Sequence, residues 1–87
     1  MTKYKLKRGI AYREIAGNIY IVDSKNSLLH QLNETATFIW RCLLSGKNLE
    51  EIVHKVCLEY DVEPEIARHD VEEIVTEMIN KGLVEEV

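Results

Sequence analysis

The residues that could take part in catalysis are scattered along this chain. Its three histidines lie on three different predicted elements, and none has an obvious partner: His30, His54 and His69. There is no GxSxG motif and no glycine-rich phosphate loop. The carboxylates of residues 64–81 alternate with apolar positions, as on a solvated helix face. Because catalysis needs a nucleophile with a base, or paired acids in a concave site, the sequence predicts a protein that is not an enzyme and has no catalytic residues.

Metal and thiol chemistry is equally poorly supported. Cys42 and Cys57 lie on separate apolar faces and form no CxxC pair, so neither a disulfide framework nor a zinc site is indicated. His54 lies three residues before Cys57, but two ligands do not make a metal site. We expect two reduced thiols, no bound metal and no cofactor.

The elements that position these residues begin with strands. Residues 10–15 (IAYREI), 18–23 (NIYIVD) and 28–32 (LLHQL) are apolar or β-branched runs separated by short turns, the first around Gly17. They predict a three-stranded antiparallel meander. Residues 3–7 also alternate in polarity, which fits either an extended segment or a frayed one, so residues 1–8 are left as a candidate flexible basic arm.

After residue 33 the apolar period becomes helical. Asn33 is a good N-cap for a largely buried helix ending near Leu44, on which only Thr37 and Arg41 face a polar side. Asn48 caps a second helix ending near residue 60, and a third runs from Pro64 to residue 81. Three strands followed by three helices predict an α+β, winged-helix-turn-helix-like fold in one domain, residues 1–87.

Composition and charge limit the classes of function. The chain has 87 residues, 46% of them hydrophobic, with no apolar run long enough to span a membrane and no secretion signal, so we expect a cytoplasmic protein that does not bind membranes. Residues 1–47 carry eight Lys or Arg and three acids, whereas residues 48–87 carry three and twelve. The acidic half includes the helix that would enter a DNA groove, which disfavours nucleic-acid binding. A winged-helix DNA-binding protein is the alternative function.

The strand at residues 28–32 is the better candidate site. Edge strands are usually blunted by Lys, Pro or a bulge, and this one contains none of these. Such an edge suits β-augmentation, in which a peptide adds as a further strand. The same edge could pair with its own copy, so we also expect a tendency to dimerise without a ligand.

The third predicted helix could form the other wall of a peptide groove. On a helical wheel its core stripe is Ala67, Val71, Ile74 and Met78, and Val75 and Ile79 widen the apolar arc on the side of Arg68. These two residues either line a groove beside the strand or pack on a neighbouring helix, and the wheel alone does not decide between the two.

Three segments together resemble the PqqD-like family, whose members recognise the leaders of ribosomally made, post-translationally modified peptides. They are LLHQLNETATFIW, with the strand-to-helix joint LN-x-x-A, then SGKNLEEIV and the terminal INKGLVEE. The resemblance covers residues 9 to 87 and implies a non-catalytic adaptor. It binds a precursor's leader as an added strand and presents it to a modifying enzyme, which is a radical-SAM protein or a lasso-type protease and cyclase pair. By position, the implied peptide-binding residues are Leu28, Leu29, His30, Gln31, Leu32, Arg68, Val71, Glu72, Val75 and Ile79.

Overall fold

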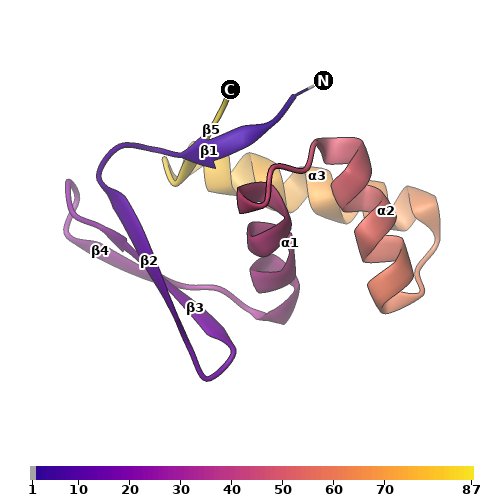
Figure 1. Ribbon diagram of the computed structural model, residues 1–87, viewed down its shortest axis with the longest axis horizontal. Coiled ribbons are helices and arrows are strands. Elements are labelled where there is room, and N and C mark those ends of the chain that lie inside the picture. The colour runs from indigo at the N-terminus through magenta and orange to yellow at the C-terminus, as the bar shows by residue number, and fades with distance from the viewer. Residues whose placement is uncertain (1) are drawn as a thin grey trace.

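The computed structural model describes residues 2–87 and contains two sheets and three helices (Figure 1). The elements follow in the order β1 (Tyr4–Leu6), β2 (Ile10–Ile15), β3 (Asn18–Asp23), β4 (Leu28–Gln31), α1 (Glu34–Leu44), α2 (Leu49–Tyr60), α3 (Pro64–Asn80) and β5 (Val84–Glu86). β2, β3 and β4 form one antiparallel sheet in that order. The predicted α+β fold, a three-stranded meander followed by three helices, is confirmed.

The N- and C-terminal strands form a second, two-stranded sheet that the sequence left unassigned. β1 pairs antiparallel with β5, and Tyr4 lies opposite Glu86. Tyr4 is buried, and burial together with the nearby Glu86 charge raises the pKa of its phenol. Residues 4–6, within the segment left as a candidate flexible basic arm, therefore form a strand. Met1 lies outside the described residues.

The helix starts follow the caps expected from the sequence. The Asn33 side chain accepts a hydrogen bond from the Ala36 N–H at 2.8 Å. At α2, Asn48 and Glu51 form a reciprocal capping box, with both bonds at 2.9 Å. α3 starts with Pro64 at its first position, where the missing N–H costs nothing. Because Asn33 caps α1 so soon after β4, only Leu32 and Asn33 separate the two elements.

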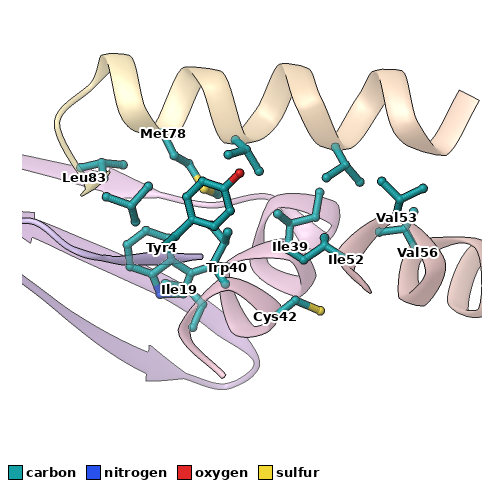
Figure 2. Packing of buried hydrophobic residues seen from close by; sticks show 14 of the residues in the cluster. Tyr4, Ile19, Ile39, Trp40, Cys42, Ile52, Val53, Val56, Met78 and Leu83 are labelled. Carbon is teal, nitrogen blue, oxygen red and sulfur yellow. The ribbon is translucent and has the colours of Figure 1, made fainter. Parts of the chain in front are cut away.

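The core lies between the sheets and the three helices. Figure 2 shows Tyr4 of β1, Ile19 of β3, Trp40 of α1 and Met78 of α3 in one buried cluster, so both sheets share a core with α1 and α3. Trp40 also meets Tyr12 edge to face, with ring centroids 5.6 Å apart. This packing fixes α3 relative to the three-stranded sheet. Among the described residues, no helix is both long enough and apolar enough to cross a membrane.

One position on α1 differs from the helical-wheel prediction. Thr37 was expected on a polar side but is buried. Its hydroxyl donates to the Leu32 carbonyl at 3.4 Å, which gives the buried oxygen a partner within the strand-to-helix joint. A threonine whose hydroxyl bonds to a nearby carbonyl can be buried without a water partner. A helical wheel sorts residues by polarity alone and therefore does not predict this burial.

Candidate functional site

β4 is an edge strand with one side unpaired. Its partner on the other side is β3, and no described strand pairs with its outer side. The Leu32 N–H donates to the Ile19 carbonyl at 3.1 Å, just beyond the end of the strand. Because backbone groups of an antiparallel strand point alternately to its two sides, those of His30 face β3 and those of Leu29 and Gln31 face outward. The outer edge therefore offers two residues' N–H and C=O groups to an added strand.

A groove of about 380 Å³ runs along this open edge. One wall is β4 and the joint that follows it, and the other is the C-terminal half of α3. The lining residues are Leu29, His30, Gln31, Leu32, Asn33, Ala36, Ile74, Glu77, Met78, Lys81 and Leu83. A strand added to β4 would thus have a helix beside it.

The groove is apolar at its base and charged at its rim. Met78 and Leu83 are buried core residues, and Ile74 is half-buried against the same core. At the rim, the Lys81 ammonium lies 2.8 Å from the Glu77 carboxylate, one helical turn away. The groove could therefore hold an apolar side chain from an added strand while the exposed rim remains solvated.

His30 faces the core side of the sheet, opposite Ile21 in the register. Its Nε2 atom is buried and has no hydrogen-bond partner among the described residues. His30 thus contributes a polar ring to an otherwise apolar part of the groove wall.

The structure brings together only part of the predicted site. From β4 and the joint, Leu29, His30, Gln31 and Leu32 line the groove, whereas Leu28 lies at its end and is 51% exposed. None of the five predicted α3 residues lines it: Arg68, Val71, Glu72, Val75 and Ile79.

These five residues face the core or α2 instead. Val71 and Val75 are buried, and Ile79 packs against the core. Arg68 makes a two-pronged salt bridge to Glu50 of α2, and it lines a separate hollow together with Glu72. This contact lowers the pKa of Glu50 through the hydrogen bond and the charge of Arg68. Val75 and Ile79, the apolar residues on the Arg68 side of α3, therefore belong to the core and do not line this groove.

The groove-lining residues of α3 lie on the opposite edge of its apolar stripe. The wheel placed Ile74 within the core stripe, at its edge, and the buried residues of α3 are Ala67, Val71, Val75 and Met78. Their centre is displaced toward Val75, which leaves Ile74 at the boundary. Glu77 and Lys81 follow Ile74 at three and seven positions and share its side of the helix. That spacing was the one signal in the sequence for this wall.

The other edge of the three-stranded sheet is less available. By the same alternation, Ile10, Tyr12 and Glu14 of β2 present their backbone groups outward. The Ile10 N–H already donates to the Lys7 carbonyl at 3.2 Å, and the Glu14 carboxylate binds Arg41 at 2.8 Å. Charged side chains on an edge discourage the addition of a further strand. β4 is therefore the edge suited to a partner.

The described residues contain no cluster of three or more His, Cys, Asp or Glu side chains that could hold a metal ion. Cys42 and Cys57 are free cysteines. Cys42 is buried, and this burial raises the pKa of its thiol, which lowers the fraction of reactive thiolate at neutral pH.

Asp23 fixes the turn from which β4 starts. Its buried carboxylate accepts from the Lys25 N–H, the Asn26 N–H and the Asn26 side-chain amide, the last at 2.8 Å. These hydrogen bonds, led by that of the Asn26 side chain, lower the pKa of Asp23. The carboxylate thus stabilises the turn in its charged form, and it does so at the end of β4 where Leu28 lies.

Asp23→Asn should therefore lower the free energy of unfolding at neutral pH. In acid, the difference between this variant and the wild-type protein should become smaller. A carboxylate with a lowered folded pKa contributes stability above its unfolded pKa and loses it as the pH falls through the folded pKa. Urea unfolding of both proteins at pH 7 and at pH 2.5 measures this difference. A gap between the two proteins that stays the same at both pH values would show that the charge of Asp23 does not support the turn.

Comparison with known proteins supports the resemblance seen in the sequence. No curated protein matches the chain. A solved structure described as TbiB1 in complex with the TbiA(beta) leader peptide is 26% identical, with a TM-score of 0.88, and the match covers 93% of this chain and 94% of that one. A second, described as lasso peptide synthetase B1 complexed with the leader peptide, is 25% identical, with a TM-score of 0.88 over 95% and 98% of the two chains. The family model for coenzyme PQQ synthesis protein D (PqqD) matches residues 19–84, which is more than half of the chain, and the chain therefore belongs to the PqqD family.

Proposed function

We propose that this protein binds the leader of a precursor peptide as an added strand on β4 and presents that leader to a modifying enzyme. The observation that carries the proposal is the open β4 edge, whose outward backbone groups at Leu29 and Gln31 border a groove walled by α3. Backbone hydrogen bonds would provide affinity, and the apolar base around Met78 would select side chains.

The family and the two similar structures support this function from different pathways. The family model is named for coenzyme PQQ synthesis, and the two solved structures are both described with a leader peptide bound. Leader binding is the property that the descriptions of the two solved structures share with the geometry of the β4 edge. The enzyme that receives the leader would be the one that modifies the same precursor.

We also propose that the protein performs no chemistry of its own. The groove lining contains one histidine and one carboxylate, His30 and Glu77, and the Glu77 carboxylate is paired with Lys81. A general base next to a nucleophile, which acyl or phosphoryl transfer would need, is not among these lining residues. The role that fits is to hold a peptide in place.

Titration with candidate leaders tests the proposal. The short peptides encoded by genes beside this one are the first candidates, and a library of random displayed peptides provides ligands independently of them. Binding is followed by fluorescence anisotropy and by amide chemical shifts of the labelled protein. We expect the largest shifts at residues 29–32 and 74–81. Shifts confined to the α2–α3 hollow around Arg68 and Glu72 would contradict the proposed site.

Duplex DNA should not compete with the leader. Residues 48–87, which include α3, carry nine more acidic than basic residues, and phosphate contacts supply most of the affinity of DNA-binding proteins. We therefore expect no sequence-specific complex tighter than micromolar at physiological salt, measured by anisotropy with labelled duplexes in the same buffer as the leader titration. A tighter, sequence-dependent complex would favour the DNA-binding alternative.

A further inference from the structure

A second hollow lies at the Leu28 end of the groove and carries a cluster of cations. It measures about 210 Å³, and we call it the basic hollow. Its lining residues are Lys7, Arg8, Ile10, Asp23, Lys25, Asn26, Gly82 and Glu85. The three basic side chains come from two separate segments, the connection between β1 and β2 and the turn between β3 and β4.

Hydrogen bonds and packing hold these two segments together. The backbone N–H and the hydroxyl of Ser24 both donate to the Gly9 carbonyl, at 3.2 Å and 2.9 Å. The Lys25 side chain lies directly over Gly9, where a Cβ would come within 3.2 Å of it, and Gly9 has a φ of +89°. A larger residue at position 9 would be strained and would displace Lys25. The cations therefore stay beside the start of β4.

The charges of this cluster are not balanced within the protein. Among residues 2–87, Lys7, Arg8 and Lys25 make no salt bridge, whereas Lys5, Arg41, Arg68 and Lys81 each have an acidic partner. Asp23 and Glu85 also line the hollow, which therefore holds three basic side chains against two carboxylates. Asp23 accepts three hydrogen bonds from its own turn, and Glu85 lies 3.6 Å from Lys5. The hollow therefore has an excess of positive charge that an external carboxylate could neutralise.

The basic hollow adjoins the groove. Lys81 and Leu83 line the groove, and Gly82 between them lines the hollow. The Lys7 N–H donates to the Leu83 carbonyl at 3.1 Å, which ties the basic segment to the base of the groove. Figure 1 shows the β3–β4 turn and the β1–β2 connection at the same end of the sheet. A strand that adds to β4 advances about 3.3 Å per residue, so a few residues beyond Leu28 it would reach the cations.

We infer that the leader bound by this protein carries acidic residues immediately beyond the segment that pairs with β4, and that the basic hollow binds their carboxylates. The inference rests on the function proposed above and specifies the chemistry of the ligand. A short acidic segment fits better than a nucleic acid, because Glu77 on the groove wall and the acidic half of the chain repel an extended polyanion. Three cations on the rim suit a few carboxylates.

The test uses a displayed library of random 16-residue peptides selected on the full-length protein. We expect wild-type protein to enrich an apolar segment followed, at one flank only, by Asp or Glu. Arg8→Gln with Lys25→Gln should enrich the same apolar segment without the acidic flank. Lys47→Gln with Lys55→Gln removes the same charge far from the groove and should select as wild type does.

A binding cycle then measures the contact itself. A selected acidic peptide should bind the Arg8→Gln, Lys25→Gln protein about 3- to 10-fold more weakly than wild type, the range expected for two exposed ion pairs. Its Asn or Gln analogue should bind both proteins equally. Apolar segments without an acidic flank, or an acidic flank that persists on the Arg8→Gln, Lys25→Gln protein, would overturn the inference and leave the proposed function intact. If no apolar segment were enriched at all, the proposed function would fail and the inference with it.

Discussion

Proline at Leu29 or at Gln31 should weaken leader binding by about 1–3 kcal/mol, which is roughly 5- to 150-fold in affinity, and leave the fold cooperative. Each substitution removes an outward N–H and leaves a carbonyl of the added strand without its donor. The free protein loses no internal bond, because edge strands accept proline where the N–H faces solvent. Isothermal titration and thermal unfolding of the same samples measure the two effects.

Proline at His30 is the matched control for this experiment. The His30 N–H faces β3, so its loss breaks the sheet ladder opposite Ile21 and should lower the melting temperature before affinity can be compared. The alternation comes from the Leu32-to-Ile19 hydrogen bond, which sets which residues face outward. Equal binding losses at all three positions, with equal unfolding, would show that the outward edge is not where the peptide pairs.

A glutamate at Ile74 should weaken leader binding by a similar 1–3 kcal/mol, the usual cost of losing a well-packed interface contact, with little effect on folding. Ile74 is half-buried and lines the groove, so its replacement places a charge against the added strand. Val75→Glu, one position along the helix, should instead cost about 3–5 kcal/mol of stability, because Val75 is only 3% exposed and the new carboxylate would be buried without a partner. Chemical denaturation and leader titration separate the two outcomes.

Ile66→Glu gives a control for the charge change on the same helix. Ile66 is 54% exposed and lies outside the groove lining, so both stability and leader affinity should stay close to wild type. If Ile74→Glu bound the leader as tightly as Ile66→Glu does, α3 would not form a wall of the binding site.

The strands and helices of this fold could be predicted from local signals. The meander followed from β-branched runs and turns, and the helix starts followed from Asn33, Asn48 and Pro64. β5 was missed, and β1 was left open between an extended and a frayed segment. These strands have three residues each, and they are stabilised by pairing with each other across almost the whole chain. Local sequence patterns do not reveal a pairing between residues so far apart in the chain.

Of the two walls of the groove, the sequence predicted the β4 edge but not the residues of α3, again because one depends on local sequence and the other on contacts between distant elements. The exposed edge could be recognised because its sequence lacks Lys and Pro, which is a local property. The groove wall formed by α3 could not be recognised in this way. The helical wheel gives the width of the apolar arc on α3, but it does not say which neighbouring element covers each side of the helix. α2 covers the Arg68 side through the salt bridge to Glu50, and this leaves the Ile74 side for the groove. Which side of α3 lines the groove therefore depends on how β4, α2 and α3 are placed relative to one another.

Amide hydrogen exchange with and without saturating leader tests strand addition on β4 most directly. We predict that the amides of Leu29 and Gln31 exchange about tenfold or more slowly in the complex, because each gains an acceptor from the added strand. The outward amides of Tyr12 and Glu14 on β2 should exchange as in the free protein. Slower exchange at Tyr12 and Glu14 with unchanged exchange at Leu29 and Gln31 would place the peptide on the other edge of the sheet and contradict the account.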